Sequence, residues 1–533
     1  MSGSSAPISV SEFARILISL PFRPSLGSRS GLTQLVSSSV EASVEVSSSP
    51  VSAQPTNTLI SMFVGCADTD ENEESSGDSS EEESQWISAD LEPNPGLKGK
   101  DINILTQSET DMGAEEPDKS DPLEDAVYRR NDKIQNFYGV TLNPLLELDY
   151  VALGDKVKND VSSGSGEYHI VYQHMVNAAT NLGMGNCLYN LTDLEYVNFD
   201  NPWWDQDCKN GFMFGDNMFV VCGDLLPSSM MITAAVMFNK TLFDEQSLDY
   251  PYQDARDGTW TIDDMLLLTK DQTRDLNGDG KVNYSDDFYG LVGWSLDCDY
   301  NFWFGAGCTM FTFDEDHLPV YQPNTDRLQT VYDKIYELIV TQQSFHVTVQ
   351  EYLSNNSMYE EPSNVFKAGR ALFYAGYLSA GTGLREMENE FGILPQPKYD
   401  EKQEEYLSFV NGAASTACVP KSLSEDALAD AGYMLEVLAS TSYYMVSDTL
   451  YDKVAKSKNA RDEESAEMVD VIIRHRVFDF GYTHFHNDGL PCASIVQTAL
   501  NSKSASITRD ITKSEKQTTK ALKKIYEAYG YDY

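Results

Sequence analysis

The chain has 533 residues, a length that allows about three or four domains or lobes. Its 83 Asp and Glu residues outnumber its 38 Lys and Arg residues, which gives a formal charge of −45. A surface this acidic repels phosphate groups, so it argues against a nucleic-acid-binding protein and against direct binding to anionic membranes. It suits a secreted protein with neutral or cationic ligands. The sequence contains no run of about 18 apolar residues, so no transmembrane helix is predicted. Its eight Cys residues are too few for a disulfide scaffold.

The N-terminal region has the composition of a low-complexity segment. Residues 1–65 are rich in Ser, Val and Pro and end in a short apolar run, Leu59–Gly65. From Ala67 to Glu83 almost every residue is acidic or small and polar, and charge repulsion keeps such a segment extended. We therefore predict a signal or low-complexity segment over residues 1–65 and an acidic, disordered tether over residues 66–98.

An apolar run, a small residue, a Cys and a polar tether together resemble the end of a bacterial lipoprotein signal peptide. The resemblance implies that Cys66 is lipidated and holds the protein on the extracellular face of the cell membrane through the lipid alone. Phe63 departs from the usual Leu, Val or Ile, and Arg29 is far from the apolar run. If translation starts near residue 55, Arg29 is not part of the protein, which would explain why this basic residue is far from the apolar run. The alternative is an ordinary disordered tail with a chance Cys.

From residue 99 onward, strand and helix patterns alternate. Asp101–Leu105 and Tyr168–Tyr172 are predicted strands, and Leu123–Phe137 has apolar residues at helical spacing. Further predicted strands are Tyr138–Leu142, Phe219–Asp224 and Ala234–Phe238, and further predicted helices are Thr261–Leu268, Ala427–Tyr444, Ser465–Arg476 and Lys516–Tyr529. The alternation predicts an α/β fold with largely parallel sheets.

Residues 275–286 match the spacing of a calcium-binding loop. Hard oxygen ligands recur at alternating positions, and Gly280 permits the sharp turn. The predicted calcium ligands are Asp275, Asn277, Asp279, the carbonyl of Lys281, and Asp286. A single loop of this kind favours a structural clip over a calcium sensor. The alternative is a surface turn that binds no ion.

This loop and its neighbours, Gly258–Met265 and Tyr289–Leu291, resemble segments of bacterial extracellular solute-binding proteins of family 1, which deliver sugars to ABC importers. Other segments follow in the family's order: Leu123–Asn131, Asn201–Asp205, Val236–Phe243, Phe366–Phe373, Phe391–Pro395 and Phe409–Ser415. The resemblance implies a type II periplasmic-binding-protein-like fold, with two α/β lobes joined by a hinge and a helical C-terminal region. The ligand would lie in the cleft between the lobes.

The resemblance also implies the domain boundaries. Lobe 1 would begin with residues 99–235, lobe 2 with the calcium loop would span 236–405, and residues 406–533 would return to lobe 1 and add C-terminal helices. The chain would cross near Ser229 and return near Asn411, which places both residues beside the cleft. The implied partners are a carbohydrate and the permease subunits of an ABC importer, and the protein would be a monomer and not an enzyme.

Sugar binding has a chemical signature of its own. Aromatic rings cover the CH faces of a sugar, and planar amides and other polar side chains bind its hydroxyls. Beside Ser229 and Asn411, the candidate ligand-binding residues are His174, Tyr300, Trp303 and Tyr377. The alternative for each aromatic residue is a place in the core.

Catalytic patterns are mostly absent from the sequence. It has no Gly-rich phosphate loop, no H-E-x-x-H and no G-x-S-x-G. His484 and His486 lack an evident third zinc ligand, and although Cys298 could bridge to Cys308, we predict no essential disulfide. Two other functions remain open. One is a secreted calcium-binding carbohydrate-active enzyme, and the other is a surface scaffold or adhesion protein that keeps this fold.

Overall fold

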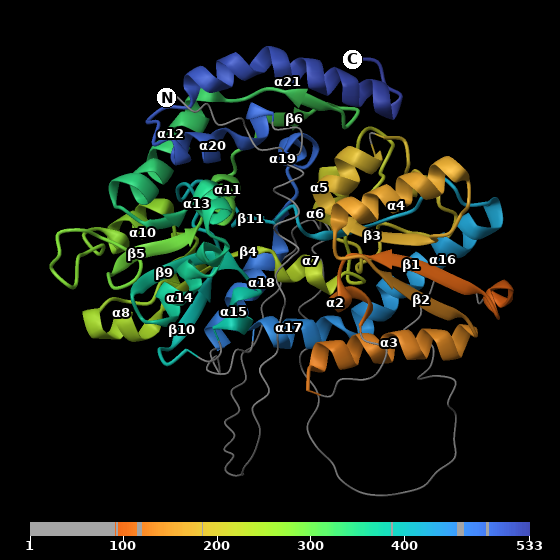
Figure 1. Cartoon of the computed structure of the whole chain (residues 1–533), viewed down its shortest axis with the longest axis horizontal. Helices are drawn as coiled ribbons and strands as arrows, with labels where there is room; N and C mark the ends of the chain where they lie inside the picture. Colours follow the sequence, from red (N-terminus) through yellow and green to blue (C-terminus); the bar gives the residue numbers. More distant parts are fainter. Residues whose placement is uncertain are drawn as a thin grey trace, which may run out of the picture. The chain divides into compact units, whose positions relative to one another are not determined.

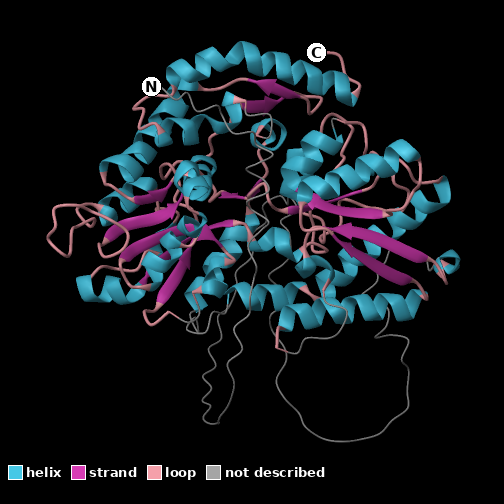
Figure 2. Cartoon of the chain, in the orientation of Figure 1, coloured by secondary structure: helices cyan, strands magenta, loops and turns pink. Residues whose placement is uncertain are grey.

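The computed structural model describes residues 91–533, with gaps at 92–93, 114–119, 184, 385–386, 456–462 and 487–489. Every described residue belongs to one compact unit. The predictions for residues 1–65, for Cys66 and for most of the tether at 66–98 lie outside the described residues. Two separate sheets, each covered by helices, define lobe 1 and lobe 2 (Figure 2).

Lobe 1 is built on a four-stranded sheet with the order β12-β3-β1-β2. Strand β1 pairs in parallel with β2 and β3, and β12 is antiparallel to β3. Helix α3 begins where the Asp121 side chain accepts hydrogen bonds from the first backbone N–H groups, and it ends at Gly139, with φ of 67°. The lobe 1 elements before the first crossing are η1 (Pro95–Leu97), β1 (Asp101–Thr106), α2 (Glu109–Met112), α3 (Pro122–Tyr138), β2 (Thr141–Leu146), α4 (Tyr150–Ser163), β3 (Ile170–His174), α5 (Met175–Asn177), η2 (Ala178–Gly183), η3 (Leu191–Asp193), α6 (Gln206–Phe212) and α7 (Pro227–Met231).

Lobe 2 is built on a five-stranded sheet with the order β10-β4-β9-β5-β8. Strand β4 is antiparallel to both of its neighbours, whereas β5 pairs in parallel with β8 and β9. The elements are β4 (Ala234–Asn239), α8 (Lys240–Gln246), α9 (Tyr252–Asp257), α10 (Ile262–Thr269), β5 (Tyr289–Trp294), α11 (Ser295–Gly305), β6 (Phe311–Phe313), β7 (Pro319–Tyr321), α12 (Thr325–Tyr336), η4 (Glu337–Thr341), β8 (Phe345–Val347), α13 (Val349–Ser354), η5 (Asn356–Tyr359), α14 (Glu361–Lys367), β9 (Ala371–Tyr377), α15 (Ala380–Gly383) and β10 (Phe391–Leu394).

The C-terminal part of the chain belongs to both lobes. Its elements are β11 (Ser408–Phe409), β12 (Ser415–Cys418), α16 (Glu425–Met445), α17 (Ser447–Ala455), α18 (Glu463–Arg474), β13 (Arg476–Val477), α19 (Phe480–Phe485), α20 (Pro491–Asn501) and α21 (Thr508–Tyr529). Helices α16 and α17 pack on α3 of lobe 1, whereas α18 packs on β10 and α20 on α11, both in lobe 2. The helices after α17 therefore extend over lobe 2, where the resemblance implied a return to lobe 1.

The structure confirms several predicted elements and corrects others. The predictions that became β1, α3, β3, β4, α10, α16 and α18 hold within a few residues, whereas α21 begins at Thr508, eight residues before the predicted start at Lys516. The predicted strand Tyr138–Leu142 begins three residues later as β2, because α3 continues through Tyr138. The predicted strand Phe219–Asp224 is wrong: the segment forms only single bridges, and its apolar residues are explained by burial in lobe 1. The sheets are mixed rather than largely parallel.

A buried carboxylate ties the middle of lobe 1 to its C-terminal return. The indole N–H groups of Trp203 and Trp204 donate to Glu436 of α16 at 3.1 and 2.9 Å. Burial raises the pKa of Glu436, while these donors oppose the rise. Both tryptophans are therefore structural. Cys308 is a buried free thiol, so no bridge to Cys298 forms.

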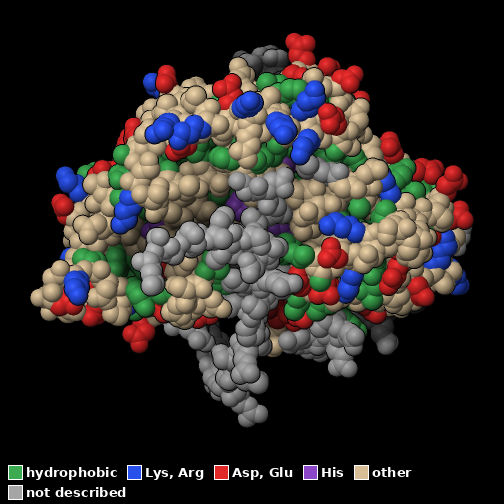
Figure 3. All heavy atoms as spheres, turned by 45° about the horizontal axis from the view of Figure 1, so that its top comes forward, with side chains coloured by type: hydrophobic (Ala, Val, Ile, Leu, Met, Phe, Trp, Pro, Cys, Tyr) green, Lys and Arg blue, Asp and Glu red, His purple; other side chains and the backbone are tan. Residues whose placement is uncertain are grey.

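Helix α21 is amphipathic and lies on the outside of the fold. Its buried stripe faces α20 and β7, and six basic side chains occupy its exposed face: Arg509, Lys513, Lys516, Lys520, Lys523 and Lys524. Figure 3 shows Lys and Arg side chains gathered on this part of the surface. Among the described helices, none is long and apolar enough to cross a membrane.

Candidate functional site

The end of β3 lies beside the segment by which the chain returns to lobe 1. Directly after His174, the N–H of Met175 donates to the carbonyl of Ala414 at 2.8 Å, and that of Val176 to Gly412 at 3.4 Å. The carboxyl ends of parallel strands are common ligand sites in α/β proteins. His174, which was predicted as a ligand-binding residue because it follows a strand, therefore lies next to the hinge.

Helix α19 lies between the two lobes at this point. The ring of Tyr482 is 5.0 Å from Tyr300 of α11 and 5.0 Å from Phe409 of β11, measured between centroids. On the lobe 1 side, α19 contacts α5 and η2. Tyr482 also approaches Gly412 so closely that a Cβ there would lie 2.9 Å from its hydroxyl oxygen.

We call His174, Tyr300, Phe409, Tyr482 and His486 the interlobe cluster. The His486 ring lies 4.8 Å from Tyr482 and 5.9 Å from Tyr300. The cluster thus combines the end of a lobe 1 strand, a lobe 2 helix, the hinge and α19. Its members come from parts of the chain that are far apart in sequence.

Three buried polar atoms of the interlobe cluster have no hydrogen-bond partner among the described residues. They are Nδ1 of His174, Nδ1 of His486 and the hydroxyl of Tyr300. Buried polar groups are normally paired, and leaving one unpaired costs about 1–3 kcal/mol. These atoms are therefore positioned to bind a polar molecule, either water or a ligand.

Burial keeps the interlobe cluster uncharged. Desolvation lowers the pKa of His174 to about 3, with a smaller contribution from His486, and lowers the pKa of His486 to about 4. Burial, assisted by Tyr482, raises the pKa of Tyr300 well above its usual value. At neutral pH the cluster offers aromatic faces and neutral polar atoms, which suits a neutral ligand.

Two further predicted residues meet at the hinge. The side-chain amide of Asn411 donates to the hydroxyl of Tyr377, at the end of β9, at 2.5 Å. The side-chain oxygen Oδ1 of Asn411 accepts from the N–H of Ala413 at 2.9 Å. This contact joins the end of a lobe 2 strand to the returning chain, one residue before Gly412.

The other two predicted ligand-binding residues pack inside the lobes. Ser229 is 1% exposed, and its hydroxyl donates to the Cys222 sulfur at 3.5 Å. Trp303 is 3% exposed and, with Tyr300 and Phe304, lines a cavity of about 10 Å³. Neither side chain is a member of the interlobe cluster.

The sequence-based prediction missed Tyr482, His486 and Phe409. The available signals were the Gly412 beside Asn411 and the pair His484 and His486, which we considered only as zinc ligands. In the structure, Nδ1 of His484 lies 3.2 Å from the Phe480 carbonyl. Within the described ranges, no group of three or more His, Cys, Asp or Glu side chains is placed to hold a metal ion.

The predicted calcium loop forms a tight turn on lobe 2. Both carboxylate oxygens of Asp275 accept backbone N–H groups, from Gly278 at 2.6 Å and from Gly280 at 2.7 Å. The amide of Asn277 donates to Asp286 at 2.7 Å, and this hydrogen bond is the main cause of the lowered pKa of Asp286. Asp279 accepts the N–H of Lys281 at 2.8 Å in the same turn, so the carboxylates of Asp275, Asp279 and Asp286 are engaged in hydrogen bonds within the loop.

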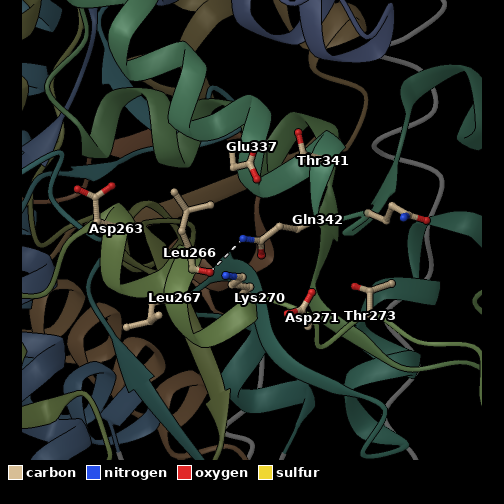
Figure 4. A pocket seen from close by; sticks show the side chains of 10 residues that line it. Asp263, Leu266, Leu267, Lys270, Asp271, Thr273, Glu337, Thr341 and Gln342 are labelled. Carbon is tan, nitrogen blue, oxygen red and sulfur yellow. Dashed lines mark hydrogen bonds between the residues drawn. The ribbon is translucent and has the colours of Figure 1, made fainter.

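An open groove of about 520 Å³ lies elsewhere on lobe 2, between α10 and η4 (Figure 4). In Figure 4, the Gln342 amide points to the Leu266 carbonyl, to which it donates at 3.0 Å. Charged side chains such as Asp263, Lys270 and Glu337 line the groove. It lacks the buried aromatic rings and unpaired polar atoms of the interlobe cluster, so we do not take it as the ligand site.

No family model matches the chain, and no curated protein matches it. Solved structures do. A cyclo/maltodextrin-binding protein complexed with maltotetraose has a TM-score of 0.53 at 11% identity, over 80% of this chain and 96% of that one. An ABC substrate-binding protein from Listeria monocytogenes, in complex with cycloalternan, has a TM-score of 0.51 at 11% identity, over 81% of this chain and 100% of that one. The GacH receptor of Streptomyces glaucescens, solved without ligand and with acarbose, has a TM-score of 0.51 at 14% identity, over 80% of this chain and 98% of that one.

These neighbours bind sugars, and they are described as binding proteins or a receptor rather than as enzymes. The predicted two-lobe, periplasmic-binding-protein-like fold with a helical C-terminal region is confirmed. The likeness is to the same kind of protein that the sequence segments resemble. At identities this low, it establishes the fold alone.

We expect His174 and His486 to lower the free energy of unfolding as the pH drops from 7 to 5. His174 and His486 stay neutral in the folded protein, with pKa values of about 3 and about 4, whereas an unfolded histidine takes up a proton below 6.5. Protonation in this window therefore stabilises only the unfolded state, by about 2 kcal/mol for each histidine at pH 5. Urea unfolding at both pH values measures the loss.

The double variant His174→Gln/His486→Gln checks this prediction. Between pH 7 and pH 5, its free energy of unfolding should fall by about 4 kcal/mol less than that of the parent protein. An unaltered pH dependence in the double variant would show that these two rings do not stay neutral on folding.

Proposed function

We propose that this protein is an extracellular solute-binding protein that captures a neutral carbohydrate between its lobes and delivers it to an ABC importer. The observation that carries the proposal is the interlobe cluster, an uncharged set of aromatic rings with unpaired polar atoms at the hinge of this fold. Aromatic faces and neutral hydrogen-bonding atoms match the CH patches and hydroxyls of a sugar. The sugar ligands named for the similar structures support the same class of ligand.

An oligosaccharide is the expected size of ligand. The resemblance to sugar importers' binding proteins and the abundance of aromatic side chains, 30 Tyr, 23 Phe and 6 Trp, support it. The permease subunits of the importer would then be the partner, and the protein would act as a monomer without catalysis. The residues that meet in the interlobe cluster are aromatic rings and histidines, not the carboxylate pair that a glycosidase needs.

A thermal-shift screen of the full chain against neutral oligosaccharides tests the proposal. We expect one glycan class to raise the melting temperature by several degrees, because a ligand that binds only the folded state stabilises it. The glycan should be recovered intact. Cleavage would favour a carbohydrate-active enzyme, and no shift across a broad panel would favour a surface scaffold protein.

The variant Tyr300→Phe tests whether the interlobe cluster is the binding site. It removes a buried hydroxyl that has no partner among the described residues, so the ligand-free protein should keep its stability. Binding of the glycan found in the screen should weaken by about tenfold, the loss of one hydrogen bond. Tyr332→Phe is the matched control: its hydroxyl donates to the Ser504 carbonyl, so stability should fall while binding stays unchanged.

We propose that calcium binds the loop at 275–286 as a structural clip. Asp275, Asn277, Asp279, the Lys281 carbonyl and Asp286 would hold the ion, which would replace the hydrogen bond between Asn277 and Asp286. Excess chelator should lower the melting temperature of the parent protein. Asp275→Asn should melt lower and no longer respond to chelator, while Glu401→Gln, at an exposed carboxylate elsewhere on lobe 2, should still respond. An unchanged melting curve in chelator contradicts the proposal.

We also propose that Cys66 carries a lipid anchor. The sequence supports this with the apolar run before Cys66 and the acidic segment after it. The chain should partition with cell membranes, and Cys66→Ala should release it to the soluble fraction. Cys308→Ala, at a buried core thiol, should leave the partitioning unchanged. If Cys66→Ala stays with the membrane fraction, as Cys308→Ala should, the result argues against the lipid anchor.

A further inference from the structure

Helix α21 is firmly held by lobe 2 over most of its length. At its start, the side-chain oxygen of Gln329 in α12 accepts the backbone N–H of Ile507 at 2.9 Å. Further along, the hydroxyl of Tyr526 donates to the Pro319 carbonyl of β7 at 3.0 Å. The buried stripe of α21, which includes Leu522, belongs to the same hydrophobic core as lobe 2.

The other end of α21 lies on lobe 1. The Tyr529 hydroxyl donates to the Ala179 carbonyl at 3.4 Å, and its ring lies 4.9 Å from Phe214. Two residues later, the Tyr531 hydroxyl accepts the N–H of Asp216 at 2.9 Å. We call the lobe 1 segment 213–219, which holds Tyr531 and the Tyr529 ring, the socket.

The socket is shaped to receive the end of α21. Gly215 has φ of +59°, and a Cβ there would lie 2.2 Å from the Tyr531 hydroxyl, so no larger residue fits without displacing the tyrosine. The turn between β6 and β7 reaches the same segment, because the N–H of Gly215 donates to the His317 carbonyl at 3.1 Å. Lobe 2 therefore contacts the socket through both α21 and this turn.

Besides α17 and α19, which contact both lobes, the lobes are joined at two further places. One is the hinge, where the chain crosses at Thr233 and returns at Asn411, and the N–H of Asn411 donates to the Ile232 carbonyl at 3.3 Å. The other is the socket, reached by α21, which runs along the outside of the fold from α12 to lobe 1 (Figure 1). Hinge opening in two-lobe proteins requires that the lobes be free to separate away from the hinge.

We propose that α21 is a strap that limits the separation of the lobes, and that its Tyr529 and Tyr531 end must leave the socket before the interlobe cluster can open widely. The two ends are unequal. The lobe 2 end buries a long apolar stripe, whereas the lobe 1 end is held by two tyrosine rings, which pack on Phe214 and Phe219, and by a few hydrogen bonds. The lobe 1 end is therefore the one that releases.

The strap is tested by a distance between the lobes, measured without any ligand, so its failure is separate from a failure of the proposed function. Nitroxide labels at Asn159→Cys on α4 and Lys367→Cys on α14, both exposed positions, report the lobe separation by double electron–electron resonance. Cys66→Ser removes one competing thiol, and the Cys residues of the described part are buried. The parent chain should give one narrow distance distribution.

Variants on both sides of the contact should widen that distribution. Gly215→Ala pushes the tyrosine out of the socket, and Tyr531→Ala removes it, so both should add a population at longer distance. Gly164→Ala is the control for backbone strain, because its φ is +66° with nothing within 4 Å of the added Cβ. Tyr533→Ala is the control for the chain end, because that ring packs on Tyr526 of α21 itself.

Circular dichroism first confirms that each variant is folded. Tyr531→Phe provides a milder variant that keeps the ring and loses the hydroxyl, which accepts from the N–H of Asp216 and the side-chain amide of Asn217. The strap predicts broadening in Gly215→Ala and in the Tyr531 variants, and none in the two controls. Identical distributions in the parent and the socket variants would overturn it. Equal broadening in the controls would overturn it as well, because the effect would not depend on the socket.

Discussion

The close approach of Tyr482 to Gly412 holds together the parts of the chain that meet between the lobes. A side chain at Gly412 would collide with Tyr482 and with Val176, so the hinge can run past α19 only as glycine. The same tyrosine packs on Tyr300 and Phe409, which fixes α11 and β11 relative to α19. Tyr482 therefore links the returning chain at Gly412 to the lobe 2 rings of the interlobe cluster.

The interlobe cluster is electrically unlike the surface of the protein. The chain carries a formal charge of −45, yet burial keeps His174, His486 and Tyr300 uncharged. A charged ligand would lose its hydration there without gaining a partner of opposite charge from these side chains. A neutral, hydroxyl-rich ligand would pair the unpaired polar atoms and stack on the rings, which is the physical basis of the proposed sugar binding.

Much of the fold could be predicted from the sequence, because strands such as Asp101–Thr106 and capped helices such as Pro122–Tyr138 carry local signals. His174 was identified because it follows such a strand, and Asn411 because Phe409–Ser415 resembles a hinge segment of the family. The rest depends on contacts that are distant in sequence. Phe219–Asp224 is apolar because it is buried in lobe 1. The sequence around Tyr482 does not show that this residue contacts the hinge, and the sequence around Tyr531 does not show that it enters the socket.

The central claim is that a ligand is held by both lobes and α19 together. Hydrogen–deuterium exchange of the full chain, with and without the glycan that shifts its melting curve, tests this most directly. The account predicts simultaneous protection of β3 (Ile170–His174), α11 (Ser295–Gly305) and α19 (Phe480–Phe485). Protection confined to one lobe, or to the groove between α10 and η4, would contradict it.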